Sequence, residues 1–318
     1  MLDFVLSHRE KFEKVFTSKS HAIMLESEDQ VLTSNLAKLF AMNLSCKSSE
    51  KPCKICSSCL KIIDNNSLDT FVYPTKDVIL MDDVNDILQN ISIVPAENEY
   101  KVFILQNFDE ASLIVQNKLL KTIEEPPRFV KFVLTAKSKN KVAQTICSRC
   151  EVISLPKFSN EELKSLVSYL SPDMAQVVIE NSNGSISLLQ KIKLENNFIE
   201  NYNFALNVLL NLENSKQILN FSSKLSKDKE NFLEILDLIY NFLFDVIKIN
   251  EGQENLVQNK YCLYQLQKIS QKYSQKACLN IQEKIVVIKD KIKFNGNLSI
   301  IVDDFMLNIL EEKWKNKK

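Results

Sequence analysis

Short apolar runs alternate with helical patterns over the first 156 residues, and after Pro156 only helical patterns follow. Five runs rich in β-branched or aromatic residues are predicted strands: Ala22–Leu25, Thr70–Tyr73, Val102–Leu105, Lys131–Thr135 and Glu151–Leu155. Helices are predicted between them, at Ser34–Leu44, Asp82–Ile91 and Ser112–Glu124. Strands that alternate with helices form βαβ units, so the sequence predicts a largely parallel sheet covered by helices.

The remaining sequence predicts a helical region. Ser159 and Glu162 form a capping box that begins a helix, and Gly184 lies in a polar turn suited to end one. From about residue 200 onward the sequence reads as amphipathic helices. We therefore predict three parts: an α/β domain at 1–156, a small helical domain at 157–200 and an all-α domain at 201–318.

Composition and charge narrow the class of protein. The chain has 318 residues, of which 45% are hydrophobic and 25% charged, as in an ordinary globular protein. Forty basic residues balance forty acidic ones, so tight binding of DNA by this chain alone is not expected. We find neither a membrane span nor the pattern of a signal peptide. We expect a cytoplasmic protein whose eight cysteines are reduced or metal-bound.

Four of the cysteines have the spacing of a metal site. They follow the pattern C-x6-C-x2-C-x2-C at Cys46, Cys53, Cys56 and Cys59. Four thiolates hold a zinc ion tetrahedrally and leave no open position for substrate, so the predicted zinc is structural. Two alternatives stay open, namely thiols clustered by chance and a redox Cys-x-x-Cys pair, although the neighbours lack the Trp-Cys-Gly-Pro type of context.

Residues 21–40 have the order of a phosphate-binding motif: a strand, a polar turn and a helix. Such a turn binds phosphates because glycines let the backbone N–H groups approach closely and a lysine reaches the β- and γ-phosphates. This turn contains no glycine and no lysine, and Glu26, Glu28 and Asp29 give it negative charge. That charge is expected to repel a nucleotide.

Three stretches together resemble bacterial clamp loaders of the AAA+ class, the gamma/tau and delta prime subunits of DNA polymerase III. They are the strand–turn–helix at His21, the four-cysteine segment after it, and residues 117–155 with the phrases LLKTIEEPP and TICSRC. Sequence motifs of the family match over about residues 1–195. The remainder resembles the family only in its length and in being helical. It implies an AAA+-like (RecA-type) α/β domain with a zinc insert, a helical lid and a helical collar that joins subunits.

The resemblance also implies where the parts of an ATP site would fall. The glycines of the phosphate loop fall on Ser27, Gln30 and Leu32, its lysine on Thr33 and its magnesium-binding hydroxyl on Ser34. None of the first four positions holds the residue that the loop requires. The phosphate loop is therefore degenerate.

The other parts of the site are replaced as well. The metal-binding Asp and the catalytic Glu of the family fall on Gln106 and Asn107, whose amides cannot act as a base or supply the charge that magnesium requires. The polar sensor residue falls on Ala136, and the arginine after the lid glycine falls on Ser187. We expect no bound nucleotide and no intrinsic ATPase activity, so the resemblance is to the non-hydrolysing kind of subunit.

The phrase Ser148-Arg149-Cys150 matches a phrase of this family that contains an arginine. In the family, that arginine is presented to ATP on a neighbouring subunit. Arginine contributes planar, bidentate contacts to phosphate, and a chain with 37 lysines has only three arginines. The resemblance thus implies that Arg149, with Ser148 beside it, acts in trans as an arginine finger. The alternative is a surface or structural arginine paired with a carboxylate.

The function implied is support of ring assembly and of sliding-clamp loading in DNA replication. The implied partners are the gamma/tau and delta subunits, with the clamp and primed DNA reached through the complex. Three alternatives stay open: an active gamma-type ATPase, a stand-alone zinc-dependent nucleic-acid-binding protein, and a degenerate relative without a clamp-loading role. The missing glycines argue against the first, and the neutral charge argues against the second.

Overall fold

The computed structural model describes residues 1–74, 77–194, 198–226, 228–294 and 296–315. The chain divides into two compact units: Met1–Phe158 with Ser185–Leu188, and Ser159–Gly184 with Leu189–Lys318. The division of the second unit into lid and collar stays a prediction. Its boundary near residue 200 borders residues 195–197, which lie outside the described residues.

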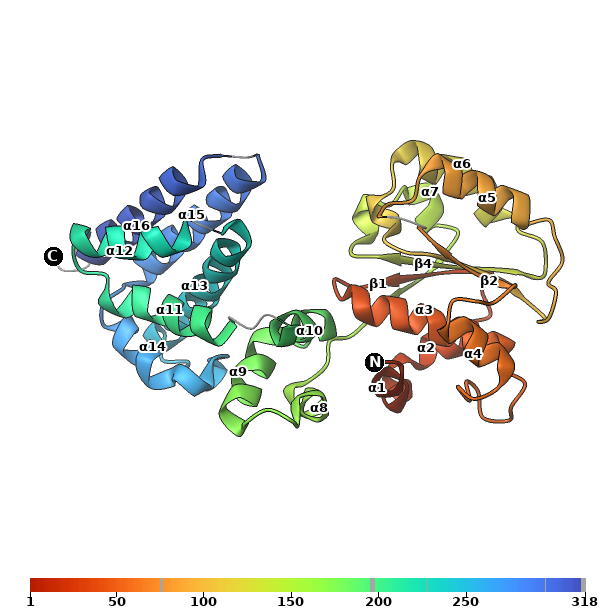
Figure 1. Cartoon of the computed structure of the whole chain (residues 1–318), viewed down its shortest axis with the longest axis horizontal. Helices are drawn as coiled ribbons and strands as arrows, with labels where there is room; N and C mark the ends of the chain where they lie inside the picture. Colours follow the sequence, from red (N-terminus) through yellow and green to blue (C-terminus); the bar gives the residue numbers. More distant parts are fainter. Residues whose placement is uncertain (75–76, 195–197, 227, 295, 316–318) are drawn as a thin grey trace. The chain divides into compact units, whose positions relative to one another are not determined.

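The first unit is built on a five-stranded sheet in the order β2-β3-β4-β1-β5 (Figure 1). The strands are β1 (Ala22–Glu26), β2 (Thr70–Tyr73), β3 (Lys101–Leu105), β4 (Val130–Ala136) and β5 (Glu151–Ser154). All four pairings are parallel. The predicted strands and their parallel arrangement are confirmed, with each strand end within one residue of its prediction.

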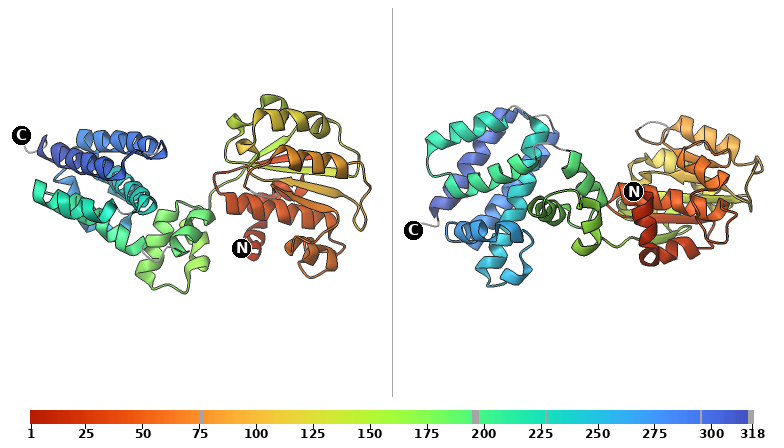
Figure 2. Two further views of the ribbon diagram at one scale, coloured as in Figure 1. Left: turned by 45° about the horizontal axis from the view of Figure 1, so that its top comes forward. Right: turned by 60° about the horizontal axis from the view of Figure 1, so that its bottom comes forward.

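Helices cover both faces of this sheet (Figures 1 and 2). One layer contains α1 (Leu2–Ser7), α2 (Glu13–Thr17), α3 (Gln30–Ser45) and α4 (Ser57–Ile63). The other contains α5 (Met81–Asn90), α6 (Leu113–Glu124) and α7 (Gln144–Cys147). The predicted start of α3 at Ser34 is wrong: the helix begins four residues earlier, because the Asp29 side chain caps it by accepting a hydrogen bond from the Leu32 N–H.

The alternation of side chains along the strands explains how the layer with α5 and α6 is held. Met24, Phe103 and Phe132 point to one face of the sheet and pack in a single buried cluster with residues of α5 and α6. The rings of Phe71, Phe103 and Phe132 stack with centroid separations of 5.2 and 5.5 Å. Burial of a phenylalanine side chain contributes about 1.5–3 kcal/mol, so this ladder is a main source of sheet stability.

The described part of the second unit is helical. Its α-helices are α8 (Asn160–Leu163), α9 (Pro172–Ser182), α10 (Ile186–Leu194), α11 (Phe198–Asn211), α12 (Ser215–Leu225), α13 (Lys229–Asn250), α14 (Leu263–Ser270), α15 (Gln275–Lys293) and α16 (Leu298–Lys315). The first three residues of α10 belong to the first unit. The predicted capping box of Ser159 and Glu162 is confirmed. Within the described ranges, no helix combines the length and the apolar character needed to cross a membrane.

One buried carboxylate fixes the loop that leads into β3. Asp69 is fully buried and accepts hydrogen bonds from the backbone N–H groups of Ala96, Glu97 and Asn98 at 2.6–2.9 Å. Burial opposes ionisation of Asp69, but these three donors outweigh it and hold its pKa below the ordinary value. The ionised carboxylate therefore stabilises the folded loop.

Replacement of Asp69 by alanine is expected to lower the free energy of unfolding by about 2–3 kcal/mol at pH 7, because it leaves buried N–H groups unpaired. Since the folded-state pKa of Asp69 is depressed, its contribution is present above the unfolded-state pKa of about 3.9 and is lost as the pH falls through the folded-state pKa. Urea unfolding of both proteins at pH 7 and pH 3 measures the difference.

The control for this prediction is Asp64→Ala, at the exposed end of α4, which is expected to change the free energy of unfolding by less than about 0.5 kcal/mol. A difference between wild type and Asp69→Ala that stays the same at both pH values would contradict the role given to the ionised carboxylate.

Candidate functional site

The carboxyl ends of β1, β3 and β4 meet at one edge of the sheet, because β4 lies between the other two strands. A hollow of about 300 Å³ opens at this edge. It is lined by residues from α3 and from the ends of β3 and β4: Gln30, Val31, Ser34, Asn35, Gln106, Asn107 and Thr135. In open α/β sheets this edge is the usual place for a ligand site. The hollow is thus the candidate site of the first unit.

Two hydrogen-bonded pairs join α3 to the end of β3 across the hollow. Gln30 Nε2 donates to Asn107 Oδ1 at 2.9 Å, and Gln106 Nε2 donates to Ser34 Oγ at 2.6 Å. We call these two pairs the amide clasp. Asn107 has a positive φ of 51°, which asparagine tolerates better than most residues, and its N–H donates to Thr135 Oγ1 at 3.0 Å.

The clasp contains neutral groups only. Phosphate chemistry needs a lysine or arginine near the phosphates and a carboxylate to hold magnesium or orient the nucleophile. Gln106 and Asn107 occupy the positions on which the resemblance places an Asp and a Glu. The Gln106 side chain and the Asn107 backbone N–H each donate a hydrogen bond within the protein. The arrangement can cross-link two elements, but its amides cannot act as a general base.

The other positions of the predicted phosphate loop, Ser27, Leu32 and Thr33, do not line the hollow. Ser27 continues the pairing of β1 through its N–H, which donates to the Ala136 carbonyl at 3.0 Å. Leu32 and Thr33 are buried, and Thr33 Oγ1 donates to the Gln30 carbonyl at 3.1 Å. Of the five predicted positions, Gln30 and Ser34 line the hollow, and the other three do not.

The acidic pair that follows β3, Asp109 and Glu110, does not line the hollow. Asp109 is buried and accepts a hydrogen bond from the Lys137 N–H at 3.2 Å. Glu110 pairs with the Lys137 ammonium at 2.7 Å. Both carboxylates thus bond to Lys137, the first residue after β4, and stabilise the loop there.

Arg149 lies between α7 and β5 and pairs with a carboxylate that the sequence did not single out. Its Nη2 donates to Glu124 Oε1 at 2.8 Å, and its Nη1 donates to the Thr145 carbonyl at 2.7 Å and to Ser148 Oγ at 3.3 Å. The bond from Arg149 lowers the pKa of the Glu124 carboxyl. The Arg149 side chain is 30% exposed, so the pair is accessible from solvent. Glu124 ends α6 within the phrase LLKTIEEPP, which was the available signal.

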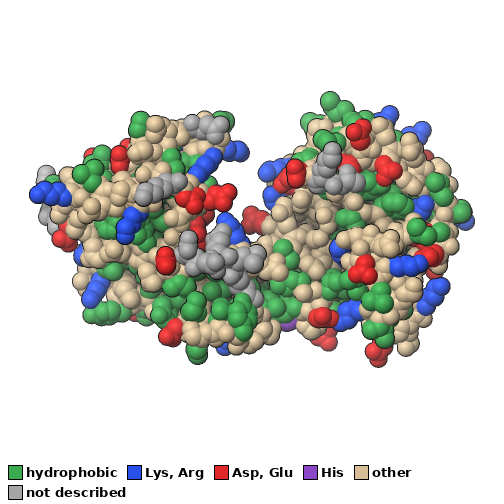
Figure 3. Space-filling model, viewed as in Figure 1, with side chains coloured by type: hydrophobic (Ala, Val, Ile, Leu, Met, Phe, Trp, Pro, Cys, Tyr) green, Lys and Arg blue, Asp and Glu red, His purple; other side chains and the backbone are tan. Residues whose placement is uncertain are grey.

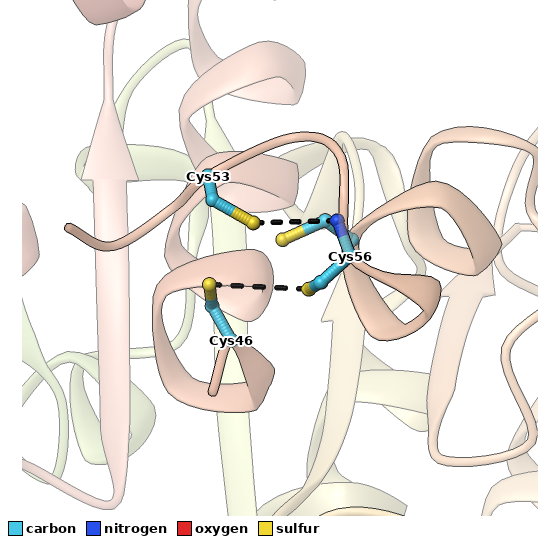
Figure 4. A group of neighbouring side chains, drawn as sticks. Cys46, Cys53 and Cys56 are labelled. Atoms are coloured by element: carbon cyan, nitrogen blue, oxygen red, sulfur yellow. Dashed lines mark hydrogen bonds between the residues drawn. The ribbon is translucent and has the colours of Figure 1, made fainter. Parts of the chain in front are cut away.

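The four predicted cysteines come together in space. Their sulfur atoms all lie within 4.8 Å of one another, and Figure 4 shows those of Cys46, Cys53 and Cys56 turned toward a common point. The N–H groups of Ile55 and Cys56 lower the pKa of the Cys53 thiol to about 6. Tetrahedral zinc–thiolate bonds of about 2.3 Å require sulfurs about 3.8 Å apart, so this donor set fits a zinc ion after small adjustments.

Positive and negative side chains are mixed on one face of the molecule. On the face drawn in Figure 3, Lys and Arg side chains alternate with Asp and Glu side chains over each unit. This distribution agrees with the zero net charge of the sequence. It gives no support to electrostatic binding of nucleic acid by this chain alone.

Two protein-family models match the chain. The model described as "DNA polymerase III, delta subunit" matches residues 10–159. The model described as "DNA polymerase III, delta subunit, C terminal" matches residues 196–310. Together they cover most of the chain, including the sheet, the cysteine cluster, Arg149 and most of the helical region.

Curated relatives carry the names of related subunits. A DNA polymerase III subunit gamma from Buchnera aphidicola subsp. Baizongia pistaciae is 30% identical over 42% of this chain and 36% of that protein. Another, from Buchnera aphidicola subsp. Schizaphis graminum, is 24% identical over 92% of this chain and 89% of that protein. The tau subunit of Escherichia coli K12 is 29% identical over 47% of this chain and 24% of its own length. The chain thus matches about a third of the first of these relatives and a quarter of tau.

Solved structures give more distant similarities. A DNA polymerase III, gamma subunit-related protein from Thermotoga maritima is 16% identical, with a TM-score of 0.48 over 96% of this chain and 99% of that one. The Bacillus subtilis DNA clamp loader delta protein is 12% identical, with a TM-score of 0.35 over 95% of this chain and 99% of that one.

The amide clasp is expected to couple α3 to β3 energetically. In a double-mutant cycle, Gln30→Ala and Asn107→Ala should show a coupling free energy of about 0.5–1.5 kcal/mol, the usual net value of one hydrogen bond. The cycle cancels the separate cost of placing alanine at the positive φ of position 107. Urea unfolding of the four proteins measures it.

The matched control pairs Gln30→Ala with Asn90→Ala on α5, whose side chain bonds within its own helix. Those two changes should add within about 0.5 kcal/mol. If the Gln30 and Asn107 changes were equally additive, the clasp would contribute no coupling.

Proposed function

Because the chain belongs to the clamp-loader family of DNA polymerase III subunits, we propose that it is the non-hydrolysing delta prime subunit of that complex. The observation that carries the proposal is the amide clasp. Where an ATPase needs carboxylates beside its phosphate loop, this chain has Gln106 and Asn107, joined to α3 by neutral hydrogen bonds. The protein binds no nucleotide and has no ATPase activity of its own.

In this proposal the chain works as one member of a ring. Its partners are the gamma/tau and delta subunits, and it reaches the sliding clamp and primed DNA through the complex. The AAA+-like domain spans 1–156 with its zinc insert at 46–59, the lid spans 157–200 and the collar spans 201–318. Large apolar side chains exposed on α15, on α16 and between them support an assembly role for the collar: Val286, Val287, Phe294, Ile300 and Leu307.

Arg149 acts in trans on ATP bound by the adjacent gamma/tau subunit. Its guanidinium is already at the surface, where Glu124 and the Thr145 carbonyl hold it. A γ-phosphate, like a carboxylate, offers negatively charged oxygens that accept from guanidinium N–H groups, so it can take the place of Glu124 on the same N–H donors. Charge that develops on the transferring phosphoryl group is then stabilised by the arginine. Ser148 helps to orient the guanidinium through its hydroxyl.

Replacement of Arg149 by alanine or lysine is expected to lower ATP turnover of the reconstituted complex at least tenfold, because lysine cannot reproduce the planar, bidentate contact. The assay uses the full chain with gamma/tau and delta from the same organism, the clamp and primed DNA. Size-exclusion chromatography checks that each variant complex assembles.

The exposed Arg128→Ala serves as the matched control, since it removes the same charge elsewhere on the α/β domain. Unchanged turnover in both Arg149 variants, with intact assembly, would exclude the arginine finger and leave a role in assembly only.

We further propose that the four clustered cysteines bind one structural zinc ion. Support comes from the convergence of the four sulfurs and from the burial of Cys46 and Cys59. All four donors are thiols, so when the ion is bound it supplies cohesion to the insert and has no free position for a substrate. The residues 46–59 then fold with the metal.

Purified protein is expected to contain one zinc ion per chain, measured by mass spectrometry of the metal content. Cys59→Ser should lose most of the zinc, whereas Cys147→Ser, at a cysteine outside the cluster, should keep it. A strong chelator should raise hydrogen exchange in residues 46–63 and leave the sheet protected, because the metal stabilises the insert locally. Equal zinc content in the two variants would contradict this site.

The second candidate is an active gamma-type ATPase, which the names of the relatives favour. Titration of the isolated chain with ATP and magnesium distinguishes it, since detectable binding supports the ATPase and its absence supports the delta prime role. The stand-alone zinc-dependent nucleic-acid-binding protein predicts strong, salt-dependent DNA binding by the isolated chain.

A further inference from the structure

Asp29 lies in the turn between β1 and α3 and is 5% exposed. It caps α3, since its Oδ1 accepts a hydrogen bond from the Leu32 N–H at 3.0 Å. A capping aspartate normally serves one helix and keeps its second oxygen in water. The carboxylate of Asp29 is buried and makes further contacts.

The further contacts come from Ser185–Leu188, a segment that belongs to the same compact unit. The Ile186 N–H donates to Asp29 Oδ2, and the Ser187 N–H donates to Asp29 Oδ1 at 3.2 Å. The Ser187 hydroxyl also donates to Asp29 Oδ1, and in turn it accepts from the Val31 N–H at 2.9 Å. One carboxylate therefore receives donors from the starts of two helices, α3 and α10.

This arrangement has the chemistry of a phosphate site. The first N–H groups of a helix have no partner within the helix, and together with the helix dipole they bind anions. In a nucleotide-binding protein the anion comes from outside. Here Asp29 supplies it from the turn itself, and both of its oxygens are used.

The residue at position 187 agrees with a negative group on the turn itself. In the ATPase subunits that the sequence resembles, the position that falls on Ser187 holds an arginine, a positively charged group. In this chain the negative group is on the turn at Asp29, and position 187 contributes a neutral hydroxyl and an N–H. Donor and acceptor are thus both built into the chain.

We propose that the Asp29 carboxylate is a built-in anion that holds Ser185–Leu188 on the phosphate-loop turn in place of a nucleotide phosphate. The segment stays fixed whether or not nucleotide is present. The proposal concerns the chain by itself and does not depend on Arg149 acting in trans.

The simplest competing explanation is that Asp29 only caps α3. The variant Asp29→Ser separates the two, because a serine can still cap α3 through its hydroxyl but has no second oxygen and no charge. A matched control is Asp228→Ser on the cap of α13, where the aspartate serves a single helix through the N–H groups of Glu230 and Asn231.

The experiment is hydrogen–deuterium exchange of the full chain, followed in peptides that cover residues 185–188. The N–H groups of Ile186 and Ser187 bond to Asp29, so their exchange reports on the carboxylate directly. We expect exchange at least about tenfold faster in Asp29→Ser than in wild type, since hydrogen bonds to a charged acceptor are lost. Asp228→Ser should leave these peptides unchanged. Millimolar inorganic phosphate should not alter them in wild type, because the donors are already occupied.

Two results would overturn the proposal. One is unchanged exchange at 185–188 in folded Asp29→Ser, which would leave Asp29 as an ordinary cap. The other is slower exchange in wild type on addition of phosphate, which would mean that the donors await an external anion. Far-UV circular dichroism checks folding, and Asp29→Asn, which keeps the shape but removes the charge, provides the same test if the serine variant does not fold.

Discussion

The position of β4 between β1 and β3 is the constraint on which the candidate site depends. In a parallel sheet all strands end at the same edge, so this order brings the turn after β1, the amides after β3 and Thr135 of β4 together. The strands are held in that order by their ladders and by the stacked rings of Phe71, Phe103 and Phe132. The cross-links of the hollow are possible only because the hydrophobic core fixes its three walls.

The chemistry of the hollow follows from the cost of unpaired charge. A lysine and two carboxylates at such a site are balanced by a bound nucleotide and its metal, and without them they would be unpaired in a half-enclosed space. Neutral amides avoid this cost because each can donate to a neighbour, as Gln30 does to Asn107 and Gln106 to Ser34. The residues thus join the two elements without a ligand.

The sequence predicted what local patterns specify and missed what distant contacts decide. The strands were predicted within one residue because continuous β-branched and aromatic runs mark buried parallel strands, and the cysteine cluster followed from its spacing. The start of α3 was wrong because Asp29 was read as part of a polar turn and not as a cap. The partners of Arg149 and Asp29 lie 25 and 158 residues away, at Glu124 and Ser187, beyond the reach of any local pattern.

The acidic side chains of the turn after β1 have another role in the structure than the one predicted from their charge. From the sequence, Glu26, Glu28 and Asp29 were expected to repel a nucleotide. In the structure Glu26 accepts hydrogen bonds from the Lys139 N–H and the Ser154 hydroxyl, and Asp29 is buried under the starts of two helices. Of the three, Glu28 is the one exposed to solvent.

Repulsion between charges weakens as the salt concentration rises, whereas N–H donors that already bond to Asp29 are unavailable to a phosphate at any ionic strength. Occupied donors therefore account for the proposed lack of nucleotide binding better than repulsion does.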